Sequence, residues 1–212
     1  MGRHRGERST LAAVPDESEH IHGEILEDDE AAASEEEELE RAARRLVALS
    51  RIRQYGDPAL RMKARNVETY DADLERLVER MTHLMHDAQG VGLAATQVGV
   101  LRRLFVFVDE GEDRVLVNPF ISARSDETSA DDEGCLSLQG VLVPVERAAE
   151  VTIEGSDVKG EPLRFEFLEP TARIVQHELD HLDGVLILDR TDEASRRAAL
   201  AKLRPQPVLG GR

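Results

Sequence analysis

The feature that most constrains this chain is the stretch Val175–Leu182, which contains the pattern His-Glu-x-x-His. In a helix, residues four apart lie on the same face, so His177 and His181 can both reach one metal ion. Glu178 follows the first histidine, so its carboxylate can handle the protons of a water molecule that the metal binds. The pattern therefore predicts metal-assisted hydrolysis, but it does not name a substrate.

The residues around the pattern predict the helix that it requires. Pro170 and Thr171 mark a helix start, and Gly184 marks a C-terminal stop. One stripe of this helix carries the two histidines, the glutamate and Ile174. A second, apolar stripe suits packing against a sheet and consists of Ala172, Val175, Leu179 and Leu182. We therefore expect a helix with a core face beside a chemical face.

The composition of the chain limits what surrounds this helix. A length of 212 residues suits one catalytic domain with an appended segment. The hydrophobic content of 41%, with 3% aromatic residues and no Trp, predicts an aliphatic core. No apolar run approaches the roughly 20 residues that span a membrane, and the N-terminus has no apolar signal core. We expect a cytoplasmic protein that binds neither a membrane nor, lacking a basic surface pattern, nucleic acid.

Charge is distributed unevenly along the chain. Pro15 to Glu40 holds 13 of the 43 acidic residues and no Lys or Arg, whereas the rest is nearly neutral. Residues 1–33 lack periodicity, which predicts disorder, and Ser34 opens a capping-box pattern that predicts a helix over 34–50. We expect three segments: an acidic extension over 1–45, a catalytic domain over 46–204 and a flexible tail over 205–212.

The remaining patterns predict a mixed fold. Apolar residues at helical spacing predict a helix over 73–88, and 192–203 is expected to form a terminal helix. Ser122–Asp132 is interpreted as a polar loop. Short apolar runs predict strands over 104–108, 115–118, 141–143, 150–154 and 163–167. The expected fold class is α+β, with small, mostly antiparallel β-sheets packed around the central His-bearing helix.

Cys135 is the only cysteine, which excludes a disulfide within the chain. A lone cysteine commonly serves as a small buried apolar residue, but a catalytic metal typically takes three protein ligands and keeps one position open. With His177 and His181, Cys135 completes that count, and a thiolate with two imidazoles suits a borderline divalent ion. Three downstream carboxylates are alternative third ligands: Asp189, Asp192 and Glu193. A metal-dependent endopeptidase therefore stays open, as does a non-enzymatic protein with a structural zinc site.

Three blocks, in this order, resemble the peptide deformylase family. Gly90–Gln97 resembles its Gly-x-Gly-Leu-Ala-Ala-x-Gln motif, and Glu133–Ser137 resembles its Glu-Gly-Cys-Leu-Ser motif. Gln176–Gly184 resembles its Gln-His-Glu-x-Asp-His-Leu-x-Gly motif. Tyr55–Pro58 and Asp189–Arg190 also fit. The resemblance covers about residues 50–200, and it favours a deformylase over the endopeptidase.

The resemblance implies a hydrolase that removes the formyl group from the N-terminal formyl-methionine of newly synthesised peptides. It implies that Cys135, His177 and His181 bind one divalent metal, natively ferrous iron, with zinc, nickel or cobalt as substitutes. Water on the metal would attack the formyl carbon, and Glu178 would take its proton and later give it to the leaving amine. Glu133 would orient a ligand. The implied partners are N-formyl-methionyl peptides and nascent chains, met close to the ribosome.

The resemblance also implies the contacts to substrate. The Gln97 side chain and the Leu136 backbone N–H would stabilise the oxyanion. Val91 and Ile174 would line an apolar pocket for the methionine side chain. Binding of the peptide as an added strand would fall to Gly90, Val91 and Gly92. The chain departs from the family at Leu138-Gln139-Gly140, where an apolar residue, Pro and Gly are usual, so this loop is expected to differ in shape.

Overall fold

The computed structural model describes residues 36–203. The segments interpreted as disordered or flexible, 1–33 and 205–212, lie outside the described residues. The chain divides into two units, Met1–Ala42 and Ala43–Arg212. The predicted N-terminal helix is confirmed over 36–50. Within the second unit, its last turn buries Ala48 and Leu49 in the core.

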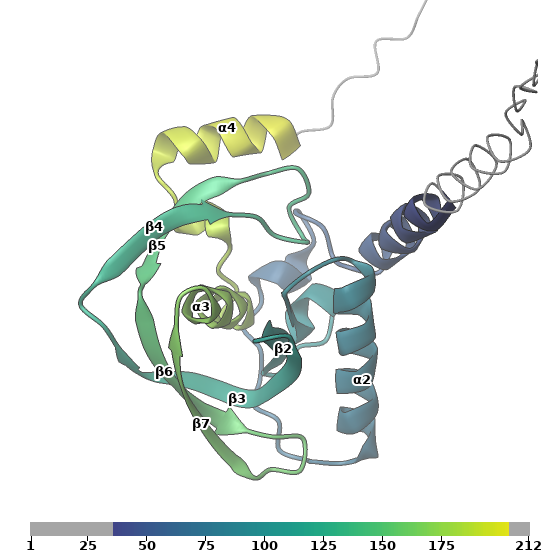
Figure 1. The fold of residues 1–212 in the computed structure, drawn as a ribbon, viewed down its shortest axis with the longest axis vertical. Coiled ribbons are helices and arrows are strands. Elements are labelled where there is room, and N and C mark those ends of the chain that lie inside the picture. The colour runs from purple at the N-terminus through teal and green to yellow at the C-terminus, as the bar shows by residue number, and fades with distance from the viewer. Residues whose placement is uncertain (1–35, 204–212) are drawn as a thin grey trace, which may run out of the picture. The chain divides into compact units, whose positions relative to one another are not determined.

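The elements agree with most of the predicted ranges, and their labels are those of Figure 1. In chain order they are η1 (Pro58–Arg61), α2 (Ala72–Asp87), β1 (Gly92–Ala94), η2 (Ala95–Val98), β2 (Leu104–Asp109), β3 (Glu112–Arg124), β4 (Thr128–Glu133), β5 (Val143–Ala148), β6 (Glu150–Ser156), β7 (Pro162–Leu168), α3 (Thr171–Leu182), η3 (Ile187–Asp189) and α4 (Glu193–Leu203). Within residues 36–203, no helix has both the length and the apolar character to cross a membrane.

The interpretation of Ser122–Asp132 as a loop is wrong. Strand β3 continues to Arg124, and β4 begins at Thr128, so most of this stretch is extended. The reason is exposure: in β4 only Glu133 is buried, so the strand has no apolar alternation. A strand whose side chains stay in water carries no period-2 signal in its sequence.

The strands form two antiparallel sheets. One sheet has the order β1-β2-β3-β6-β7, and β4 pairs with β5 in a second, two-stranded sheet. Every neighbouring pair of these strands is antiparallel. The predicted α+β class with small, mostly antiparallel sheets is therefore confirmed.

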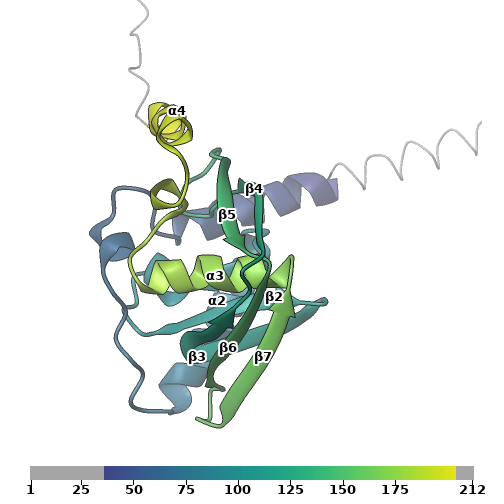
Figure 2. The same cartoon turned by 90° about the vertical axis from the view of Figure 1, so that its left-hand side faces the viewer.

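Strand β2 separates the two main parts of the core. Leu104 and Val106 join the cluster of buried residues that contains the α2 side chains, whereas Phe105 and Phe107 join the cluster that contains α3. Successive side chains of a strand point to opposite faces. Helices α2 and α3 consequently lie on opposite faces of the sheet (Figures 1 and 2). Burial on both faces explains why this strand is one continuous apolar run.

Helix α3 packs as its sequence predicts. All four residues of its apolar stripe belong to the cluster that includes Phe105, Phe107 and Ile153. Gly184 follows the helix with a φ of 75°, which is the left-handed conformation expected at a C-terminal stop. In the remaining stripe, the histidines lie toward Cys135 on the loop that joins β4 and β5, whereas Glu178 packs against the backbone of Gly92 in β1.

Candidate active site

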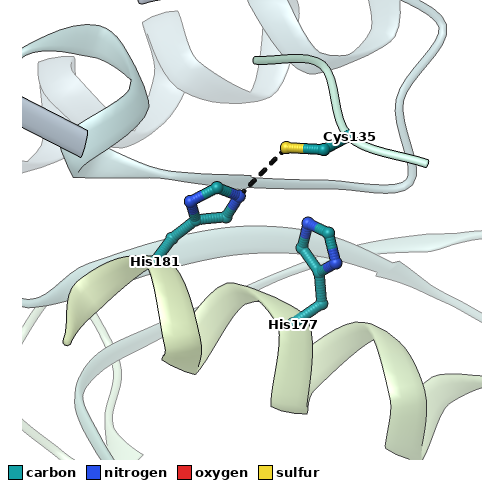
Figure 3. Close-up of side chains that lie close together, drawn as sticks. All are labelled: Cys135, His177 and His181. Carbon is teal, nitrogen blue, oxygen red and sulfur yellow. Dashed lines mark hydrogen bonds between the residues drawn. The ribbon is translucent and has the colours of Figure 1, made fainter. Parts of the chain in front are cut away.

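Cys135, His177 and His181 come together in the structure. The cysteine lies on the loop after β4, and both histidines lie on α3 (Figure 3). Their ligand atoms are all within 4.8 Å of one another, and the Cys135 Sγ lies 3.2 Å from the His181 Nε2. Two imidazoles and a thiol at this spacing suit a borderline divalent ion. The predicted metal-ligand group is therefore present.

The alternative ligands have other partners. Asp189 accepts a hydrogen bond from the Leu186 N–H and pairs with Arg61. Asp192 caps the start of α4, and Glu193 pairs with an arginine on that helix. Within the described residues, the group at the histidines contains no fourth ligand. Three ligands are typical of a catalytic site, and four of a structural zinc site.

An ion-paired network holds the His177 ring through its Nδ1. The His177 Nδ1 lies 2.9 Å from the Glu133 Oε2, and Arg147 donates two hydrogen bonds to the same carboxylate, at 2.8 and 2.9 Å. Arg173 donates a further one at 3.0 Å. Because Glu133 accepts the proton on Nδ1, the Nε2 is left to face the metal-ligand group. The family resemblance implies this orienting role for Glu133, and the contact places the carboxylate where the role requires it.

The ionisation of Glu133 is set by these contacts. Burial favours the neutral carboxyl, but the hydrogen bonds from Arg147 and His177 outweigh it and hold the pKa of Glu133 well below its ordinary value. The two histidines shift in opposite directions. Burial opposes the charge on both, yet contacts with Cys135 and Glu133 raise the pKa of His177, while the nearby His177 adds to burial and lowers the pKa of His181.

Glu178 is a buried carboxylate with an unused oxygen. The residue is 4% exposed, and its Oε2 has no hydrogen-bond partner among the described residues. Burial raises the pKa of Glu178 to about 7. The backbone of Gly92 packs directly against it, since a Cβ at that position would lie 2.4 Å from the Glu178 Oε1. A carboxylate in this setting can both accept and return a proton near neutral pH.

Gln97 is held with its amide nitrogen toward the metal-ligand group. Its Oε1 accepts a hydrogen bond from the Ala94 N–H at 2.8 Å. Its Nε2 donates to the Ser137 Oγ at 3.1 Å and lies 3.7 Å from the Cys135 Sγ. The carbonyl of Leu136, beside the cysteine, accepts a hydrogen bond from the Gln54 Nε2 at 3.1 Å. Within residues 36–203, the Leu136 backbone N–H has no acceptor, so it is available to a ligand.

One cavity of about 520 Å³ contains nearly all the predicted site residues. It is lined by Gly90, Val91, Gly92, Gln97, Glu133, Cys135, Leu136, Ile174, His177 and Glu178. His181 does not line it and reaches the site through its contact with Cys135. Arg45 and Leu49 of the helix at 36–50 also line the cavity. Sequence reasoning missed both, because the motifs begin only after this helix.

Sequence reasoning also missed Arg147 and its pairing with Asp180. Arg147 donates a hydrogen bond at 2.6 Å to Asp180, which in turn accepts one at 3.0 Å from Arg190. One signal was available: Arg147 follows Val143 and Val145 at every second position of β5, all three facing inward. A charged residue at an inward strand position requires a buried partner. Nothing in the spacing identifies Asp180 as that partner.

Comparisons with known proteins agree with this geometry. The family model described as polypeptide deformylase matches residues 49–197. A peptide deformylase of Acidothermus cellulolyticus is 44% identical over 164 residues, which cover 77% of this chain and 91% of that protein. One from Pseudothermotoga lettingae is 44% identical over 154 residues, covering 73% and 89%.

Solved structures of peptide deformylases share the fold of this chain. The crystal structure of a peptide deformylase from Legionella pneumophila superposes with a TM-score of 0.69 and 39% identity, covering 72% of this chain and 91% of that one. The structure of the peptide deformylase from Thermotoga maritima does so with a TM-score of 0.66 and 41% identity, covering 67% and 97%. The sequence match, the shared fold and the Cys/His/His group together show that this chain belongs to the peptide deformylase family.

Proposed function

We propose that this deformylase hydrolyses the formyl amide at the N-terminal formyl-methionine of newly synthesised peptides, with Glu178 as the general base and acid. The observation that carries this assignment is the buried Glu178 carboxylate, in the same cavity as Cys135 and His177 and on the same helix as His181. Formate and a free α-amine are the products.

The protein groups divide the proton and charge transfers between them. Glu178 takes a proton from the attacking water through its unpartnered oxygen and returns it to the amine nitrogen as the C–N bond breaks. The Gln97 Nε2 and the Leu136 N–H donate hydrogen bonds to the formyl oxygen as it gains negative charge. Both donors are held by neighbouring contacts, so they need little rearrangement during the reaction.

Cys135, His177 and His181 would hold the divalent ion, and their donor atoms fit that task. When bound, the ion would supply Lewis-acid activation of water and of the formyl oxygen. We propose ferrous iron as the native ion, as the family resemblance implies, with zinc, nickel or cobalt able to replace it. Glu133 holds the His177 ring in place.

The cavity lining supports a peptide substrate. The segment Gly90, Val91 and Gly92 offers a backbone edge for an added strand. Val91 and Ile174 provide apolar surface for the methionine side chain. The natural substrates would then be nascent chains, met in the cytoplasm close to the ribosome. Cosedimentation of the protein with ribosomes that carry nascent chains tests this part.

The function is tested by anaerobic assay of formate release from formyl-Met-Ala, with metal analysis of the same sample. We expect turnover in proportion to the bound metal, and the highest activity with iron. Acetyl-Met-Ala and an internal peptide bond serve as matched controls and should not be cleaved. Cleavage of the internal bond, with no formate released, would favour an endopeptidase.

A further inference from the structure

We propose that Arg45 makes this enzyme selective for formylated peptides that carry an acidic side chain a few residues after the formyl-methionine. The inference rests on the proposed function, and it deepens it by naming a substrate class. It starts from Arg45, a residue of the helix at 36–50 that lines the same cavity as His177 and Glu178. None of the motifs matched in this sequence lies in this helix.

The backbone of α2 holds the Arg45 guanidinium in place. Its Nε donates a hydrogen bond at 3.3 Å to the carbonyl of Ala88, the residue that caps the C-terminal end of that helix. Gly90 lies two residues further on and lines the cavity. A peptide that adds a strand along Gly90, Val91 and Gly92 therefore passes close to this guanidinium.

The positive charge of Arg45 is left unpaired. Among the described residues, no carboxylate forms an ion pair with it, and its side chain is exposed. The other arginine of the cavity, Arg173, is committed to Glu133 and Glu169. Of the cavity's two arginines, Arg45 is thus the one whose remaining N–H groups can meet a ligand carboxylate.

Apart from the buried Glu178, one carboxylate lines the same cavity without an ion pair among the described residues. Asp132 is an exposed residue of β4, a strand distant in sequence from the Arg45 helix. A peptide carboxylate is attracted by Arg45 and repelled by Asp132, so the effect of an acid depends on its position along the peptide. A positional series of peptides is therefore the informative probe.

The expected preference is modest. Arg45 is solvent-exposed, and charge pairs in water change binding by about two- to fivefold. The preference should appear mainly in KM, because Arg45 touches the peptide away from the reacting bond and acts equally on ground and transition states. It should shrink in about 0.5 M salt, which screens exposed charges.

The test uses the full-length, metal-loaded enzyme and C-terminally amidated formyl-Met peptides. Asp or Asn is placed in turn at the second, third and fourth positions, and kcat/KM is measured for each pair. We expect the wild type to favour Asp over Asn by about two- to fivefold at one or more positions. Arg45→Gln should bring that ratio to about one, Arg45→Lys should keep it above one, and Arg45→Glu should invert it.

Arg51→Gln is the matched control, since it removes an exposed arginine that does not line the cavity. It should keep both the activity and the Asp preference of the wild type. If Arg45 only caps α2, Arg45→Gln would lower thermal stability and leave every Asp/Asn ratio unchanged. Equal ratios in wild type and Arg45→Gln, with good turnover of the Asn peptides, would overturn the selectivity and leave the deformylase function standing.

If no peptide releases formate, the proposed function fails, and binding decides the inference on Arg45. The unformylated Asp and Asn peptides are then titrated against wild type and Arg45→Gln by calorimetry. Tighter binding of an Asp peptide that is lost in Arg45→Gln supports the inference, and equal affinities overturn it.

Discussion

The two sides of His177 differ sharply in how their polar atoms are satisfied. On its Nδ1 side, Arg147 bridges Glu133 and Asp180 through ion pairs at 2.6 to 2.9 Å, and Arg173 and Arg190 complete the network. On the other side, the Glu178 Oε2 is buried and has no partner among the described residues. Both sides contain buried carboxylates, but only one of them leaves an oxygen unpaired.

The difference separates the carboxylate that holds His177 in place from the carboxylate that can transfer a proton. Burial acts on both carboxyls in the same direction, yet Glu133 stays charged because two partners outweigh burial, and Glu178 has its pKa raised to about 7 because burial prevails. A fully paired carboxylate orients its neighbour and is a poor proton carrier. An unpaired carboxylate costs stability but can carry a proton. The comparison can be tested by removing groups from each side.

The largest effect on activity is expected from Glu178→Gln. This variant keeps the three metal ligands and removes the base, so kcat should fall by about 10²- to 10⁴-fold with little change in bound metal. Formate release and metal content of the same sample measure the two quantities. Wild-type turnover in a metal-loaded Glu178→Gln sample would contradict the role of Glu178 as general base and acid.

A smaller loss is expected from Gln97→Glu. The substitution keeps an oxygen to accept the Ala94 N–H and replaces the nitrogen that faces the metal-ligand group. Loss of one oxyanion donor should lower kcat by about 10²- to 10³-fold. Steady-state kinetics on formyl-Met-Ala provide the check. A raised KM at unchanged kcat would instead mean that Gln97 only binds the substrate.

Behind His177, Glu133→Gln should act on the metal more than on the chemistry. The amide can still accept a hydrogen bond from the His177 Nδ1, but it no longer neutralises Arg147. Metal affinity should fall by about 10- to 100-fold, while kcat at saturating metal stays within a few-fold of wild type. Metal titration followed by activity separates the two effects. Intact affinity with a large loss of kcat would place Glu133 in the reaction itself.

The smallest effect is expected at the outer end of the network, from Arg190→Gln. The Arg190 side chain is 48% exposed, so its pair with Asp180 is screened by water. We expect a loss of about 1 kcal/mol or less in the free energy of unfolding, with activity unchanged. Urea denaturation measures the loss. Arg147→Gln is the contrasting variant, because it removes one partner of a buried ion pair. It should lower the free energy of unfolding by about 3–5 kcal/mol.

Much of the site could be predicted from the sequence, because several of its reactive side chains lie within a few residues of one another. His177, Glu178 and His181 share a helix face, and the apolar stripe beside them identifies the packing side. The ligand count made Cys135 a candidate beside three downstream carboxylates. The resemblance to a family favoured it among them, since no spacing rule connects a residue 42 positions upstream of the first histidine. Spacing cannot show pairings made by the fold alone, such as Arg147 with Asp180 or Arg45 with the cavity. The polar strand β4 was missed for a different reason, because its side chains face water.

The location of Cys135 has a consequence for folding. Cys135 packs against the cluster that contains β5, η3 and α4 residues, whereas α3 packs into the cluster under the large sheet. An ion shared by Cys135 and the two histidines would therefore join two separate core clusters. Binding to the native state alone stabilises it by about 2.7 kcal/mol when free metal is 100 times the dissociation constant. In this chain, loss of metal should therefore loosen the attachment of one core cluster to the other as well as stop catalysis.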